Sequence, residues 1–157
     1  MKSKKTYVLT VSRQFIKSHP KAGQETVFVD KILSGKKIHT IRANYDFWKK
    51  RIDEVTAGSA TLSVRYWSGK PYNSKQITIV DLTKDDGVGI QKLQFLCDGD
   101  RIYSLKWFSI DNNMNVDANW SDLSINDGLS LEDFRAWFKG YDLSQSMAII
   151  HFTKFRY

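Results

Sequence analysis

The chain has 157 residues, an apolar fraction of 41% and a formal net charge of +7. Its length predicts one domain over residues 1–157, and no apolar run approaches the roughly 20 residues of a membrane helix, so we expect no membrane partner. The positive charge makes nucleic acid the first partner to consider. Cys97 is the only cysteine, which excludes an intrachain disulfide and favours a reducing, cytoplasmic setting.

The first half of the chain predicts two strands and two helices. A β-branched, apolar run over 7–11 is typical of a strand. Apolar residues at helical spacing predict a helix over 25–34, with Gly35 as its C-terminal stop. A short strand over 38–42 and a second amphipathic helix over 45–55 are expected next.

The second half adds more strands and one further helix. Asp98-Gly99 is a tight-hairpin signal, and Ser130 is a good N-cap for a helix. In chain order we predict strands over 60–67, 76–82, 93–97 and 101–107, a polar loop over 109–119, a helix over 131–138 and a last strand over 148–155. The pattern indicates an α+β fold in which about six strands form a small barrel flanked by about three helices.

The strand over 38–42 carries the polar side chains of most interest. Alternation places Thr40 and Arg42 on one face of this strand and His39 and Ile41 on the other. Thr40 and Arg42 are therefore predicted to share a cleft.

Two separated segments carry a resemblance to a known family. In residues 28–42 a helix ends at Gly35, a lysine follows, and a Thr-x-Arg strand comes next; far downstream, Asn126-Asp127-Gly128 precedes the last predicted helix. This combination resembles the signature of the ASCH family. The resemblance implies a PUA-like mixed β-barrel that binds RNA or a modified nucleoside in a cleft between the first helix, the Thr-x-Arg strand and the Asp-Gly turn.

The same resemblance implies an alternative, enzymatic function. Some small bacterial ASCH members are acetylcytidine amidohydrolases with a catalytic Lys, Thr and Glu, and these positions correspond here to Lys37, Thr40 and Asp127, where Asp is one methylene shorter than Glu. A threonine hydroxyl needs a base to accept its proton, and a lysine serves only when its pKa is lowered. Asp127 would orient Lys37, but a close carboxylate also raises the pKa of a lysine.

The expected binding residues come from both motifs and from one further segment. Basic and aromatic residues interleave over 65–72 and 154–157, a pattern that pairs phosphates and stacks bases, although alternating aromatic residues also pack cores. The candidate RNA- or substrate-binding residues are Gly35, Lys36, His39, Arg42, Asn126, Trp67 and Lys70.

Other readings of the sequence have weaker support. Asp111-x-Asn113-x-Asn115-x-Asp117 has the spacing of a calcium loop, but Val116 stands where its turn glycine belongs, so a solvated loop is expected. The three histidines are scattered, so neither a metal site nor a ribonuclease His pair is expected, and no cofactor is. A protein-interaction role for the segment 84–120 has no mechanism in the sequence.

Overall fold

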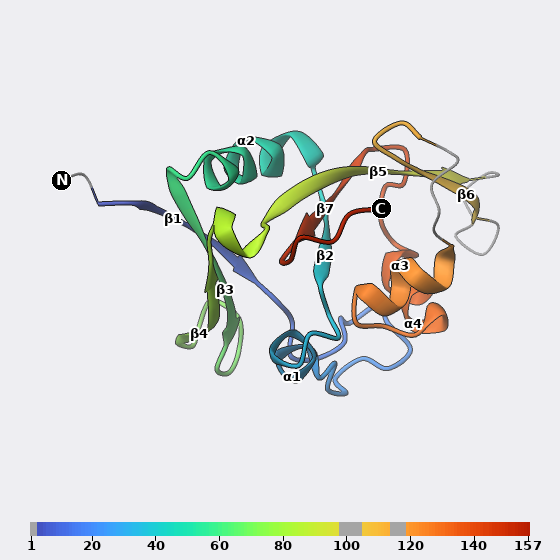
Figure 1. The fold of residues 1–157 in the computed structure, drawn as a ribbon. Helices are drawn as coiled ribbons and strands as arrows, with labels where there is room; N and C mark the ends of the chain where they lie inside the picture. Colours follow the sequence, from blue (N-terminus) through green and yellow to red (C-terminus); the bar gives the residue numbers. More distant parts are fainter. Residues whose placement is uncertain (1–2, 98–104, 114–118) are drawn as a thin grey trace.

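The computed structural model describes residues 3–97, 105–113 and 119–157 (Figure 1). The elements in chain order are β1 (Lys5–Thr10), α1 (Phe28–Leu33), β2 (His39–Ala43), α2 (Tyr45–Thr56), β3 (Ala60–Trp67), β4 (Gln76–Leu82), the 3-10 helix η1 (Lys84–Asp86), β5 (Gly89–Cys97), β6 (Leu105–Ile110), α3 (Trp120–Asn126), α4 (Leu131–Phe138) and β7 (Met147–His151).

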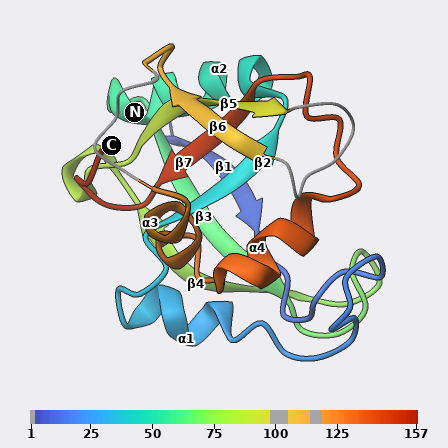
Figure 2. The same cartoon turned by 90° about the vertical axis from the view of Figure 1, so that its right-hand side faces the viewer.

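The strands form two sheets. The first has the order β1-β3-β4, with β1 parallel to β3 and β4 antiparallel to it. The second has the order β2-β7-β5-β6 and is antiparallel throughout. In the view of Figure 2 the second sheet lies in front of the first. Within the described residues the two sheets do not close into a barrel, so the α+β class is confirmed and the PUA-like barrel is not.

One apolar core joins the two sheets and the helices. Helix α2 contacts β3 of the first sheet and both β5 and β7 of the second, and its Ile52 and Val55 are fully buried. Asn44 begins this helix, because its side chain accepts a hydrogen bond from the backbone N–H of Phe47. Strand β7 lies inside the second sheet and is buried along its whole length, which explains the apolar run that precedes its last residue, His151.

Most predicted elements are present, with shifted bounds. The strands over 60–67 and 76–82 and the helix over 131–138 have the predicted limits. Helix α1 begins at Phe28 rather than at residue 25, because Val27 lies in the left-handed region with φ 62°. Helix α3 was not predicted. The Asp98-Gly99 turn and the end of the calcium-like pattern lie outside the described residues.

Among the helices of the described segments, none is both long and apolar enough to cross a membrane.

Candidate functional site

The end of α1 sets the position of Lys37. Gly35 has φ 74°, a left-handed conformation that suits glycine, and it turns the chain out of the helix. The backbone N–H groups of Lys36 and Lys37 then both donate to the carbonyl of Lys31, at 2.8 and 2.9 Å. Gly35 and Lys36 remain exposed at this turn, whereas Lys37 points into the protein and is 2% exposed.

The end of α3 sets the position of Asp127. This residue caps α3, and Gly128 follows it with φ 84°. A Cβ at position 128 would lie 3.1 Å from the side chain of Lys37, so glycine supplies both the conformation and the room for that side chain. The Asn-Asp-Gly segment is therefore a helix stop that also receives Lys37.

Lys37 and Asp127 form a buried ion pair. The Nζ atom of Lys37 donates to the carboxylate oxygen Oδ1 of Asp127 at 3.1 Å and to its backbone carbonyl at 2.5 Å. The same ammonium lies 4.3 Å from the ring centroid of Phe28, a cation–π contact. Asp127 is 4% exposed, so both charges are removed from water.

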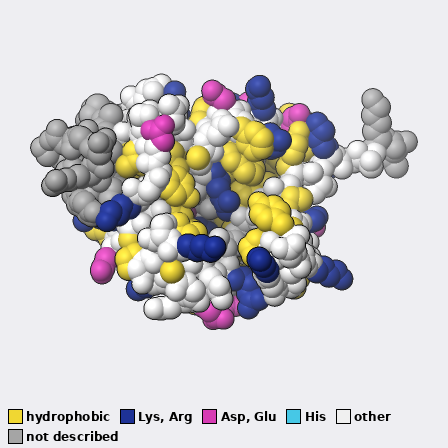
Figure 3. All heavy atoms as spheres, turned by 180° about the vertical axis from the view of Figure 1, so that it is seen from behind, with side chains coloured by type: hydrophobic (Ala, Val, Ile, Leu, Met, Phe, Trp, Pro, Cys, Tyr) yellow, Lys and Arg dark blue, Asp and Glu magenta, His cyan; other side chains and the backbone are white. Residues whose placement is uncertain are grey.

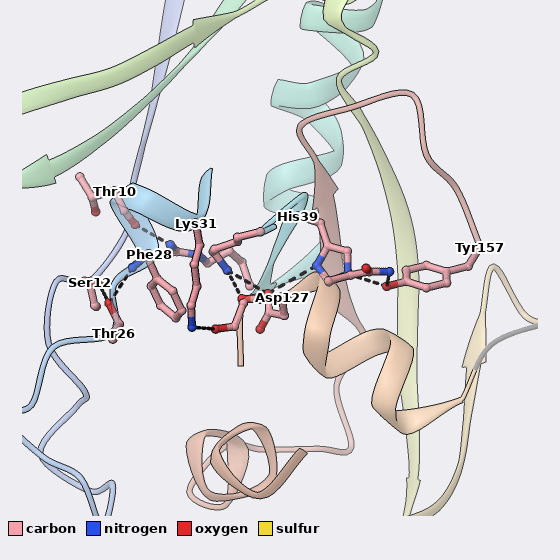
Figure 4. Close-up of polar contacts among 12 residues, drawn as sticks. Thr10, Ser12, Thr26, Phe28, Lys31, His39, Asp127 and Tyr157 are labelled. Atoms are coloured by element: carbon pink, nitrogen blue, oxygen red, sulfur yellow. Dashed lines mark hydrogen bonds and ion pairs between the residues drawn. The ribbon is translucent and has the colours of Figure 1, made fainter. Parts of the chain in front are cut away.

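His39 extends this pair into a larger group, the buried polar cluster, made of Lys37, His39, Asn126, Asp127 and Tyr157. Figure 4 shows His39 between Asp127 and Tyr157. The Nδ1 atom of His39 lies 3.4 Å from Oδ1 of Asp127, at ion-pair distance but outside hydrogen-bond geometry. Its Nε2 atom hydrogen-bonds the hydroxyl of Tyr157 at 2.6 Å, and that hydroxyl also accepts from Asn126 Nδ2 at 3.0 Å.

Burial dominates the electrostatics of the cluster. It lowers the pKa of Lys37, and Asp127 opposes this by raising it. It also lowers the pKa of His39, which favours the neutral imidazole, and raises the pKa of Tyr157. The result is a set of polar groups that pair with one another, except that the buried Nδ1 atom of His39 has no hydrogen-bond partner among the described residues.

Thr40 does not join this cluster. It lies in β2 opposite Ile150 and is buried, and its hydroxyl makes no hydrogen bond within the described part of the chain. The structure thus pairs two members of the predicted catalytic trio, Lys37 and Asp127, and shows no hydrogen bond from either to the third. The predicted binding residues His39 and Asn126 accompany that pair.

A second site, the cationic cleft, lies at the end of β1 and beside the loop between β3 and β4. It is an open cleft of about 880 Å³. Its lining residues are Thr10, Val11, Ser12, Arg13, Gln14, Phe15, Ile16, Lys17, Glu25, Arg42, Trp67, Ser68, Gly69, Lys70, Pro71 and Tyr72. Four of them are basic and one, Glu25, is acidic. A space-filling view of the back of the molecule shows a central hollow bordered by basic and hydrophobic side chains (Figure 3).

Three residues predicted to bind RNA or substrate meet in this cleft: Arg42, Trp67 and Lys70. Arg42 reaches it from β2, and its Nη2 atom donates to the carbonyl of Thr10 at 2.5 Å. Burial lowers the pKa of this guanidinium. Thr40 is not among the residues that line this cleft, so Arg42 and Thr40 do not meet in it.

Trp67 and Tyr72 form an aromatic pair on the cleft wall. Their ring centroids are 5.2 Å apart, and Tyr72 is 86% exposed. Tyr72 also has φ 64°, a strained conformation for a residue with a bulky side chain. Such strain is often found at functional positions, where the surrounding structure holds it in place.

Arg13, Lys17 and Phe15 belong to this cleft and were missed from the sequence. They lie just after the first strand, and two basic residues four positions apart are the only signal there. That signal is common on protein surfaces and does not by itself predict a site.

The described residues contain no group of three or more His, Cys, Asp and Glu side chains placed to hold a metal ion. Comparisons with protein-family models, with curated proteins and with solved structures found no match to this chain, so the ASCH resemblance stays a prediction.

Proposed function

We propose that this chain binds RNA or a nucleotide in the cationic cleft. The observation that carries the proposal is the Trp67–Tyr72 aromatic pair beside Arg13, Arg42 and Lys70. Aromatic faces stack on bases and nearby cations pair with phosphates, which together bind single strands without needing a base-specific contact.

Exposure supports this site over the buried polar cluster. A base must reach the ring on which it stacks, and Tyr72 is almost fully accessible. The lining also has more basic than acidic side chains, so the charge suits a polyanion. The proposal keeps the RNA- or nucleoside-binding role and the PUA-like relationship implied by the ASCH resemblance, and the single domain predicted from the length. It moves the binding site to Arg42, Trp67 and Lys70.

The test is fluorescence anisotropy with a labelled eight-nucleotide RNA. Affinity should fall steeply as salt rises, because phosphate pairing releases counterions. Lys70→Glu should weaken binding by more than about tenfold, because it replaces an attraction to phosphate with a repulsion. Lys50→Glu is the matched control, because Lys50 is exposed on α2 and does not line the cleft.

No measurable binding at low salt would overturn the proposal. An equal loss of RNA affinity in Lys50→Glu and Lys70→Glu would overturn it as well. Such a result would show that the affinity depends on the net charge of the protein and not on a residue of the cleft.

The alternative is an amidohydrolase that acts on an acylated nucleoside. One observation favours it: burial lowers the pKa of Lys37, as a base requires, and Asp127 holds that amine in place. Yet Lys37 is 2% exposed, so a substrate reaches it only if α1 or the Asp127 turn moves.

Chromatography of acetylcytidine incubated with the protein tests this alternative. Turnover that disappears in a folded Lys37→Ala variant would establish it. Absence of turnover in the wild type would remove it.

A further inference from the structure

A second, smaller cleft adjoins the cationic cleft. It has a volume of about 360 Å³ and lies along the start of α1. The two clefts share three lining residues, Arg13, Glu25 and Ser68, so they form one continuous groove with Arg13 at the junction.

The second cleft offers its own surface for a base. Val27 and Ile77 line it and are 45% and 39% exposed, and the ring of Tyr66 lies beside them. Val27 has the left-handed conformation noted above, which is unfavourable for a β-branched residue. Each cleft therefore presents exposed apolar or aromatic surface, and in each a residue with strained backbone contributes to it.

Arg13 is held in place at the junction. The Thr26 backbone N–H donates to the Arg13 carbonyl at 2.9 Å, and the hydroxyl of Thr26 donates to the carbonyl of Ser12 at 2.7 Å (Figure 4). The Arg13 guanidinium lies 5.5 Å from the ring centroid of Tyr66 and donates to the carbonyl of Ser68 at 3.4 Å. These contacts leave other N–H groups of the guanidinium available to a ligand.

We infer that the groove takes two consecutive nucleotides of a single strand, one base in each cleft, with Arg13 on the phosphate between them. This inference rests on the proposed function and narrows its ligand from a free nucleotide to an RNA segment. Unpaired bases are required, because a base within a duplex cannot present its face to Trp67 and Tyr72.

Glu25 is the acidic residue at the same junction. Its carboxylate repels a phosphate placed beside Arg13 and so limits the affinity. Glu25→Gln should therefore strengthen binding of a dinucleotide more than binding of a mononucleotide.

The experiment compares cytidine monophosphate, the dinucleotide pCpC and an octamer of cytidylate by calorimetry at one salt concentration. The wild type should bind pCpC at least fivefold more tightly than the mononucleotide, because the second base packs against Val27 and Ile77 and Arg13 pairs with the phosphate between the bases. Arg13→Gln should reduce this ratio below about twofold. Lys17→Gln is the matched control, because Lys17 lines only the cationic cleft: it should weaken both ligands in parallel.

The outcomes separate the inference from the proposed function. Equal affinity for the mononucleotide and pCpC, or an unchanged ratio in a folded Arg13→Gln variant, would overturn the two-nucleotide groove and leave nucleotide binding intact. Failure of all three ligands to bind, the octamer included, would overturn the proposed function itself. Circular dichroism of each variant confirms that it is folded.

Discussion

The cationic cleft and the buried polar cluster use the same kinds of side chain for opposite purposes. In the cluster, Lys37 is enclosed by Asp127 and an aromatic ring, and every charge has a partner. In the cleft, basic side chains outnumber acidic ones, and an aromatic pair faces solvent. Lys37 stabilises the fold because it is buried, whereas Arg13 and Lys70 of the cleft are exposed and remain available to a ligand.

The largest expected effect comes from breaking the buried pair. Asp127→Ala leaves the Lys37 ammonium in the interior without its carboxylate, and we expect the free energy of unfolding to fall by about 3–5 kcal/mol. Urea denaturation measures this fall. The double variant Lys37→Met/Asp127→Ala should be more stable than Asp127→Ala alone, because no unpaired charge remains. A loss under about 1 kcal/mol in Asp127→Ala would contradict this description of the cluster.

The second largest effect is expected in the pH dependence of stability, through the buried His151. Burial, with the nearby His39 and Arg156, lowers the pKa of His151 from an unfolded value of 6.5 to about 2. Between these two values the unfolded state binds the proton and the folded state does not, so stability falls as pH drops below 6.5. His151 alone should cost about 2 kcal/mol between pH 6.5 and 4.5, and His39 shifts in the same direction.

Denaturation across that range in the wild type and in His151→Gln measures this contribution. The variant retains an amide donor for Gln91, the hydrogen-bond partner of His151, but does not titrate. Its stability should depend less steeply on pH. Identical slopes would show that His151 does not resist protonation in the fold.

Tyr72→Gly tests the cleft side of the comparison. RNA affinity should fall by about 1–3 kcal/mol, because one stacking surface is lost. Glycine relieves the positive φ at this exposed position, so the free energy of unfolding should not fall and should rise by up to about 1 kcal/mol. Anisotropy and urea denaturation give the two values. A drop in both would mean that Tyr72 serves the fold instead of a ligand.

The smallest effect is expected at an exposed ion pair of the same chemistry as the buried one. Lys49 and Asp53 lie one turn apart on α2, with Nζ 2.5 Å from Oδ1 and both side chains about half exposed. Lys49→Ala should change the free energy of unfolding by less than about 0.5 kcal/mol. A loss of stability comparable to that of Asp127→Ala would mean that burial does not determine how much an ion pair contributes to the free energy of unfolding.

Local sequence patterns were enough to predict the elements with strong periodicity. The helix over 131–138 has a capping serine and a regular apolar stripe, and its bounds were predicted correctly. Helix α3 was missed because its seven residues include weak helix formers, although Asn119 and Asp122 form the capping box that marks its start. The first helix is shorter than predicted because the backbone of Val27 is left-handed, with φ 62°, so the helix begins only at Phe28.

Local sequence patterns could not predict which distant segments of the chain lie next to each other. His39 and His151 were described as scattered, yet the β2–β7 register places them directly opposite each other, with ring centroids 5.6 Å apart. In the same way, Trp67, Lys70 and Arg42 were all predicted as binding residues, but only the fold shows that they line the same cleft. Lys37 and Thr40 do not line it. Such neighbours depend on strand order, which one sequence does not encode locally.

The register between β2 and β7 also has a consequence for how the protein is made. Strand β2 leaves the ribosome more than one hundred residues before the strand that pairs with it, and β1 waits for β3 to complete a parallel pair. Contacts this distant in the chain slow folding, and the second sheet can form only after β7 has been synthesised. Until then Lys37 lacks Asp127 and His39 lacks the strand that pairs with β2, so both side chains stay in water until the downstream residues have been made.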